Sequence, residues 1–130
     1  MRQTFTKAER LSSRKLIALL FSSKQYFFQY PFKVLFHEIE AEHKFPVQVL
    51  ISVSKRNFKN AVDRNRVKRL AREAFRKNKE ILYEKRKNEE KLLLLGLIFT
   101  GKTIPEYAEI EQKIILILQR LNELNGKAVG

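Results

Sequence analysis

The chain has 130 residues, with 27 Lys or Arg against 14 Asp or Glu, which gives a formal net charge of +13. It has no cysteine and only two histidines, so disulfides, thiolate metal sites and multi-histidine metal sites are excluded. This length fits one domain with its own core, and the charge implies an anionic partner, nucleic acid before an acidic membrane surface.

The N-terminal residues 1–13 carry charges and no long apolar stretch, so we expect no signal peptide. The longest apolar runs are far below the roughly 20 residues that span a bilayer. We therefore expect a cytoplasmic protein.

The first half of the chain predicts one helix and two strands. Apolar residues at helical spacing predict a helix within residues 8–21, started by Thr6 or by Ser12–Ser13, and the aromatic residues 25–31 resemble a turn. Alternating apolar residues then predict strands over Phe32–Ile39 and Val47–Val53. The charged residues between these strands predict a loop that makes them an antiparallel hairpin.

The second half predicts a long helix, a buried strand and a last helix. The long helix is expected from about residue 61 to about residue 78, with an extension to Lys87 left open. Leu, Ile and Phe dominate 91–100, which predicts a third strand, and Pro105 begins the last helix. The end of the chain, 126–130, is expected to fray. The order αββαβα predicts one α+β domain with helices packed on a sheet and a parallel pair between the second and third strands.

Most of the positive charge lies between Lys55 and Lys79. Eleven of these 25 residues are Lys or Arg, and only Asp63 and Glu73 oppose them. A block of this kind is suited to contact phosphates.

The long helix in this block is amphipathic. Its predicted core face comprises Val67, Leu70, Ala71, Ala74 and Phe75. Cations repeat every four residues on the other side and form a ladder about 6 Å apart, made of Arg64, Lys68, Arg72 and Arg76. A solvated charged face is the alternative, but the scarcity of acids and the excess of arginine, whose planar fork suits phosphate, favour nucleic acid.

Two polar residues near the start of this helix have alternative roles. Asn65 is either a recognition contact or a cap that braces the helix start. Asp63, the only aspartate of the chain, is placed to interact with the positive helix N-terminus rather than to catalyse.

The order of residues in this block resembles one family. Ser52-Val53-Ser54-Lys55-Arg56 and the run from Asn60 to Arg76, with Arg64-Asn65-Arg66-Val67-Lys68-Arg69 at its centre, are similar to the signature of the bacterial ribonuclease P protein component. Phe5 to Leu11 resembles the start of that family, and the order of the later elements also agrees.

The resemblance implies a fold and a set of partners. The fold is the ribosomal-protein-S5-domain-2-like α–β sandwich with a left-handed crossover through the helix that carries Arg64-Asn65-Arg66, hereafter the RNR helix. The partners are the catalytic RNA of ribonuclease P, bound one to one, and precursor tRNA, whose 5′ leader is removed. Mg²⁺ acts at the RNA subunit, and no catalytic residue or metal site is expected on the protein.

The resemblance also assigns site residues. Those expected to contact RNA are Lys55, Arg56, Arg64, Asn65, Arg66, Lys68, Arg69 and Arg72, and Arg76 completes the cationic ladder. A cleft for the leader is implied at Ile17, Phe21, Lys33 and Leu35. Phe21 matches an aromatic position of the family, whereas Ile17 and Leu35 stand where the family has aromatic residues. The residues alone leave Phe21 between a core role and a cleft role.

Three other functions compete with this interpretation. A self-sufficient metal-dependent nuclease needs clustered carboxylates, and the available trio, Glu38, Glu40 and Glu42, lies beside a predicted turn. A ribosomal or other structural nucleic-acid-binding protein is the main alternative. A membrane-surface helix fails because the RNR helix needs its apolar face for the core.

Overall fold

The structure, a computed structural model, describes residues 4–127 and the side chains of residues 4–124. Its elements are a short 3-10 helix η1 (Lys7–Glu9), α1 (Arg14–Ser22), β1 (Tyr26–Gln29), β2 (Phe32–Glu40), β3 (Val47–Val53), α2 (Ala61–Asn78), α3 (Glu80–Tyr83), β4 (Lys91–Phe99) and α4 (Tyr107–Lys127). The RNR helix is α2. The predicted α+β architecture is confirmed, with one more strand than the sequence indicated.

The four strands form one sheet in the order β1-β2-β4-β3. β4 pairs antiparallel with β2 and parallel with β3, so the predicted parallel pair is confirmed. The predicted hairpin between β2 and β3 is wrong, because β4 lies between them. β4 is suited to this place, since its run of leucines is buried on both faces of the sheet.

Residues 25–31 form a strand rather than the predicted turn. β1 pairs antiparallel with β2, and only Tyr30 and Pro31 make the turn. The aromatic residues alternate as a strand requires, because Phe27 is buried while Tyr26 and Phe28 are exposed.

The boundaries of several helices differ from the predictions by a few residues, and α4 begins at Tyr107 rather than at the predicted Pro105. α1 begins at Arg14, where the Ser13 hydroxyl accepts a hydrogen bond from the Leu16 amide, and the residues before it form the separate η1. The extension beyond residue 78 is short, because α3 ends at Tyr83. α4 continues to Lys127, so residues 126 and 127 are helical instead of frayed, and 128–130 lie outside the described residues.

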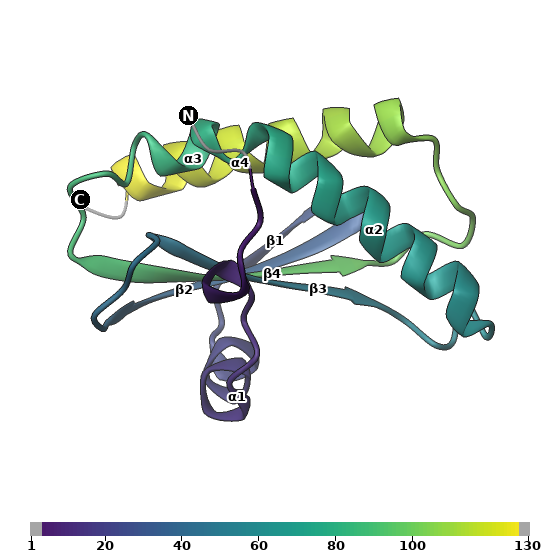
Figure 1. Ribbon diagram of the computed structural model, residues 1–130, viewed down its shortest axis with the longest axis horizontal. Helices are drawn as coiled ribbons and strands as arrows, with labels where there is room; N and C mark the ends of the chain where they lie inside the picture. Colours follow the sequence, from purple (N-terminus) through teal and green to yellow (C-terminus); the bar gives the residue numbers. More distant parts are fainter. Residues whose placement is uncertain (1–3, 128–130) are drawn as a thin grey trace.

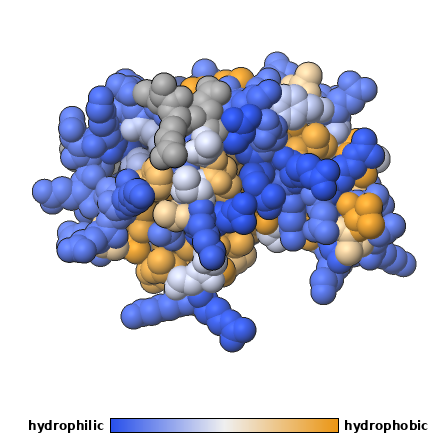
Figure 2. Space-filling view, in the orientation of Figure 1, coloured by the Kyte–Doolittle hydropathy of each residue, from blue (hydrophilic) through white to orange (hydrophobic). Residues whose placement is uncertain are grey.

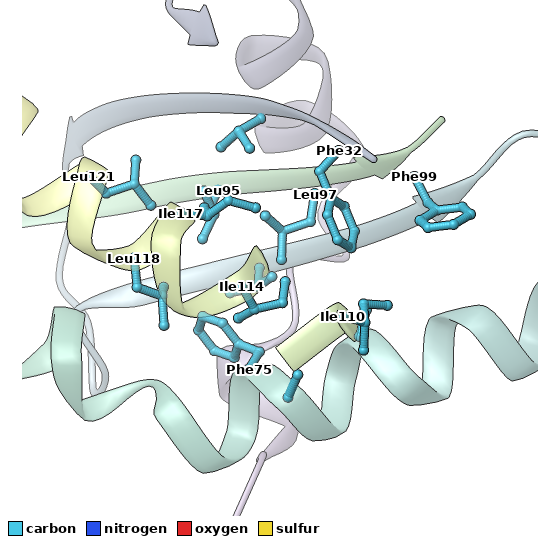
Figure 3. Packing of buried hydrophobic residues seen from close by; sticks show 14 of the residues in the cluster. Phe32, Phe75, Leu95, Leu97, Phe99, Ile110, Ile114, Ile117, Leu118 and Leu121 are labelled. Atoms are coloured by element: carbon cyan, nitrogen blue, oxygen red, sulfur yellow. The ribbon is translucent and has the colours of Figure 1, made fainter. Parts of the chain in front are cut away.

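The helices lie on both sides of the sheet (Figure 1). α2, α3 and α4 cover one face, and α1 lies on the other. The larger core lies under α2 and α4, where Phe75 of α2 meets Ile114 and Leu118 of α4 below the strands (Figure 3). This packing leaves one long side of α2 away from the core.

The smaller cluster lies between α1 and the sheet. Leu20 of α1 is buried there with Leu35 of β2 and Leu94 of β4. Gly96 makes the close approach possible, since a Cβ at this position would lie 3.1 Å from Leu20 Cδ2. α1 packs over β2 and β4, the two central strands of the sheet.

Candidate RNA interface

A basic loop, residues 54–60, joins β3 to α2 and is held firmly at both ends. The Ser54 hydroxyl accepts from the Arg56 amide, and Asn57 Nδ2 donates to the carbonyl of Thr100 at 3.1 Å. Thr100 follows β4, and β3 and β4 are parallel, so their carboxyl ends meet at one edge of the sheet. Lys55 and Arg56 are exposed at this edge.

The start of α2 is closed by two side chains. The Asn60 side chain accepts from the Val62 amide at 3.0 Å and caps the helix. Arg64 Nη1 donates to the carbonyls of Phe58 and Lys59 at 2.7 and 3.0 Å. The loop and the helix start therefore form one fixed unit.

The two predicted faces of α2 are confirmed. Val67, Ala71, Ala74 and Phe75 are buried and Leu70 packs against them. The opposite face exposes Arg66 and Arg69, while Lys68 is half-buried. Hydrophilic side chains cover most of the side of the molecule that α2 crosses (Figure 2).

The four members of the cationic ladder are not equivalent. Arg64 is bound to loop carbonyls, and Arg76 donates to both carboxylate oxygens of Glu73 at 2.5 and 3.0 Å. The hydrogen bond from Arg76 lowers the pKa of Glu73, which therefore stays ionised. Any phosphate contact by Arg76 therefore competes with this ion pair. Lys68 and Arg72 are the two middle members of the ladder, between Arg64 and Arg76.

Arg72 brings a residue from outside the basic block into the surface. Arg10 follows η1 in a short extended segment that bridges to Val49 of β3, and the Leu11 amide donates to the Val49 carbonyl at 2.9 Å. Arg10 and Arg72 line one shallow cavity of about 190 Å³. Burial lowers the pKa of Arg72, and the charges of Arg10 and Arg69 lower it further. This concentration of like charge suits an anionic partner.

Arg10 was missed as a functional candidate from the sequence. It stands about 60 residues before Arg72, and the bridge between the N-terminal segment and β3 brings the two together. Its place in the segment from Phe5 to Leu11, which matches the start of the family, was the available signal.

Asn65 and Asp63 both lie near the start of α2. The helix cap is Asn60, so the capping role considered for Asn65 is taken by another residue, and Asn65 is exposed beside Arg66. Asp63 lies in the first turn of α2, as its proposed interaction with the helix N-terminus requires.

The residues implied for the leader cleft lie on the α1 side of the sheet. Phe21 is 50% exposed, so the core role considered for it is wrong. Ile17 is half-buried against the small cluster, and Leu35 is a buried member of it. Lys33 is half-buried two residues before Leu35, on the same strand face. The structure thus groups these residues but leaves only Phe21 strongly accessible.

Two exposed aromatic residues of β1 were not predicted as site residues. Tyr26 and Phe28 are 53% and 61% exposed, and their rings meet edge to face with centroids 5.8 Å apart. Lys33 Nζ lies 5.0 Å from the Tyr26 centroid and 5.9 Å from that of Phe28. The run of three aromatic residues, Tyr26-Phe27-Phe28, was the signal in the sequence, because alternate residues of a strand point to the same face.

Within residues 4–127, no group of three or more His, Asp or Glu side chains is placed to hold a metal ion. The carboxylate trio weighed above is divided, because Glu38 accepts from Arg86 at 2.8 Å. None of the described helices has the length and apolar character needed to cross a bilayer.

Comparisons with known proteins agree with one another. The family model described as ribonuclease P matches residues 5–122. A ribonuclease P protein component of Porphyromonas gingivalis is 32% identical over 117 residues, covering 89% of this chain and 85% of that protein. One from Chlorobium phaeobacteroides is 35% identical over 130 residues, covering 91% and 89%.

The solved structure of the ribonuclease P protein from Thermotoga maritima superimposes with a TM-score of 0.68 at 25% identity, covering 86% of this chain and 96% of that one. The Staphylococcus aureus protein, at 21% identity and a TM-score of 0.65, shares the fold. The match along nearly the whole chain, together with the cationic face of α2, shows that this chain belongs to the ribonuclease P protein component family.

Proposed function

We propose that this ribonuclease P subunit binds the catalytic RNA through the exposed side of α2 and the basic loop before it. One observation carries the proposal: α2 buries its apolar stripe in the core and turns a nearly unopposed set of cations outward. The proposed contacts are Lys55, Arg56, Arg64, Asn65, Arg66, Lys68, Arg69, Arg72 and Arg76. Arg10 extends this surface, because it lines the same shallow cavity as Arg72.

The second part of the proposal concerns the single-stranded 5′ leader of precursor tRNA. Its cleft is placed on the α1 side of the sheet at Ile17, Phe21, Lys33 and Leu35. The exposed Phe21 ring offers a stacking surface, and the Lys33 ammonium offers a charge for phosphate. Because Leu35 is buried against Leu20, it supports the floor of this cleft rather than stacking.

The proposed division of labour follows from the side chains present. The protein positions the RNA and the leader, and the RNA subunit with its Mg²⁺ carries out the endonucleolytic cleavage that yields the mature 5′ end. One protein binds one RNA, and the complex works in the cytoplasm. The parallel β3–α2–β4 connection is compatible with the left-handed crossover of the ribosomal-protein-S5-domain-2-like fold, which we also propose.

Reconstitution tests this proposal. Precursor tRNA is incubated at near-physiological salt with the protein, with ribonuclease P RNA, or with both, and release of the leader is measured. We expect the protein to stimulate the RNA at low Mg²⁺ and to cleave nothing alone. Cleavage by the protein alone would place catalysis on the protein, and an absence of stimulation would favour a structural RNA-binding role elsewhere.

A further inference from the structure

Two rows of side chains cross the sheet on the α1 side. The register aligns Ser52, Ile98, Lys33 and Phe28 as successive cross-strand partners from β3 to β1. The next row contains Leu50, Gly96, Leu35 and Tyr26. Cross-strand partners project to the same face, so both rows share the face that holds α1.

The two rows differ in how α1 covers them. Leu20 rests on Gly96 and Leu35 in the middle of the second row. In the first row Ser52, Ile98 and Lys33 are half-buried and Phe28 is exposed. The first row is thus partly exposed along its length, from Ser52, near the strand end that leads into the basic loop, to Phe28 on the opposite edge strand.

The first row ends at a built aromatic pair. Tyr26 and Phe28 hold each other edge to face, and Lys33 lies within 6 Å of both ring centroids. A second cation lies at the same edge strand but on the other face of the sheet, because Arg120 of α4 donates to the Phe28 carbonyl at 3.2 Å and its guanidinium lies 4.3 Å from the centroid of the buried Phe27 ring. Two accessible rings beside the Lys33 ammonium are the elements of a stacking site for an unpaired nucleobase and its phosphate.

We propose that Tyr26, Phe28 and Lys33, here named the edge platform, form a second stacking site that holds a nucleotide of the 5′ leader away from the cleavage site. This inference rests on the leader-binding role proposed above. Three strand spacings, about 14 Å, separate β3 from β1. A leader that leaves the basic loop at the β3 side of the sheet therefore crosses β4 before it reaches the platform on β2 and β1.

The charge of the surroundings favours a polyanion over a second protein chain as the occupant. Lys33 faces the rings directly, and Arg120 lies behind the strand. A copy of this chain would bring its own large positive charge to the same edge, since the whole chain carries +13. The leader brings phosphates and bases together.

Binding to the reconstituted holoenzyme tests the platform with three ligands: mature tRNA, a precursor with a leader of about two nucleotides, and one with about ten. Loss of stacking in Tyr26→Leu/Phe28→Leu should weaken binding of the long-leader precursor about fivefold or more. The short-leader precursor and mature tRNA should bind as to the wild type. The double variant Tyr26→Phe/Phe28→Tyr, which keeps both rings, should bind the long-leader precursor with the affinity of the wild type.

Tyr30→Leu is the matched control, because Tyr30 is also an exposed aromatic residue, at 72%, but lies in the turn outside the pair. This variant should bind all three ligands normally. Equal affinity of the wild type and the platform variant for the long-leader precursor would overturn the platform. The proposed function would fail separately, if the wild type itself did not prefer the precursor to mature tRNA.

A second measurement does not depend on removing a ring. The chain has no tryptophan, so Phe28→Trp introduces a single tryptophan at the platform, whose emission can be excited apart from that of the tyrosines. Stacking of a base should quench its emission when the long-leader precursor binds, and mature tRNA should not. Unchanged emission with both ligands, or a variant defect confined to self-association measured by sedimentation, would overturn the proposal.

Discussion

Lys79 Nζ lies 2.8 Å from Glu9 Oε2, and both side chains are buried although 70 residues separate them. The Tyr83 hydroxyl donates to the same oxygen, and the Thr6 amide donates to the other at 2.9 Å. This buried ion pair fixes the N-terminal segment to the junction of α2 and α3. It therefore holds Arg10, the next residue, beside the cationic side of α2.

We expect Glu9→Gln to destabilise the protein by about 3–5 kcal/mol, because it leaves the Lys79 ammonium buried without its counter-charge. Urea unfolding measures the loss. Glu84→Gln is the control, since Glu84 is exposed. The double variant Glu9→Gln/Lys79→Met should recover much of the stability, and a double variant no better than the single one would contradict this account.

The ion pair also predicts a pH dependence. Burial opposes ionisation of Glu9, but hydrogen bonds from Lys79, Thr6 and Tyr83 and the charge of Lys79 outweigh it and lower its pKa below the ordinary 4.5. The unfolded chain thus takes up the proton at higher pH than the folded one. The stabilisation is complete above the unfolded pKa and is lost as pH falls through the lower, folded value.

Unfolding of wild type and Glu9→Gln in parallel across this acidic range measures the effect. The difference in unfolding free energy between them should shrink as the pH falls below about 4. The lowered pKa values of Glu73 and Glu111 act in both proteins and cancel in the difference. A difference that stays constant down to the acid transition would contradict the role of Glu9.

Arg66→Ala should weaken binding to the RNA subunit and reduce the slope of log affinity against log salt by about one unit. Arg66 is exposed and should lose only its phosphate contact. Arg64→Ala should lose stability as well, because Arg64 also braces the loop through two carbonyls. Lys85→Ala, an exposed cation after α3, is the control of equal charge, and an unchanged slope in Arg66→Ala would remove Arg66 from the interface.

Phe21→Ala should weaken binding of precursor tRNA more than that of mature tRNA. Half of the Phe21 side chain is exposed, so its removal should change the unfolding free energy by only about 0.5 kcal/mol. Fluorescence titration of the holoenzyme with both ligands measures the effect. Equal losses for the two ligands would exclude a leader contact.

Gly96→Val should displace α1 from the sheet. The added Cβ would lie 3.1 Å from Leu20 Cδ2 and 3.4 Å from Leu35 Cβ. The two γ-methyl groups of the new valine would add to this crowding. We expect a loss of about 1–3 kcal/mol and a weaker preference for precursor tRNA. Leu20→Ala in the same chain makes room and should restore part of the stability; no recovery would place the strain elsewhere.

Local features of the fold were largely predictable from the sequence. The bounds of α2 and β3 agree with the pattern of apolar residues, because each element is recognised from its own period. The pairing of strands was not predictable in the same way. Two strands joined by a short loop suggest a hairpin. In the structure β4, which is buried on both faces, pairs with both β2 and β3 and lies between them.

The site shows the same division. The basic face of α2 follows from helical spacing, and the family signature identifies its residues. Arg10 and the pair Tyr26–Phe28 were missed, since their roles depend on contacts with β3 and β2 that no spacing in the sequence records. The pairing of these distant segments with β3 and β2 decides which of their side chains lie on the candidate site.

The place of β4 in the sheet has a consequence for biosynthesis. β2 and β3 are made first but share no ladder with each other, and both wait for residues 91–99 to pair with them. Until then the growing chain carries two open strand edges and a cationic helix with an uncovered apolar side. The cationic helix therefore settles into the core late, after β4 has closed the sheet and α4 has followed to cover the apolar side of α2.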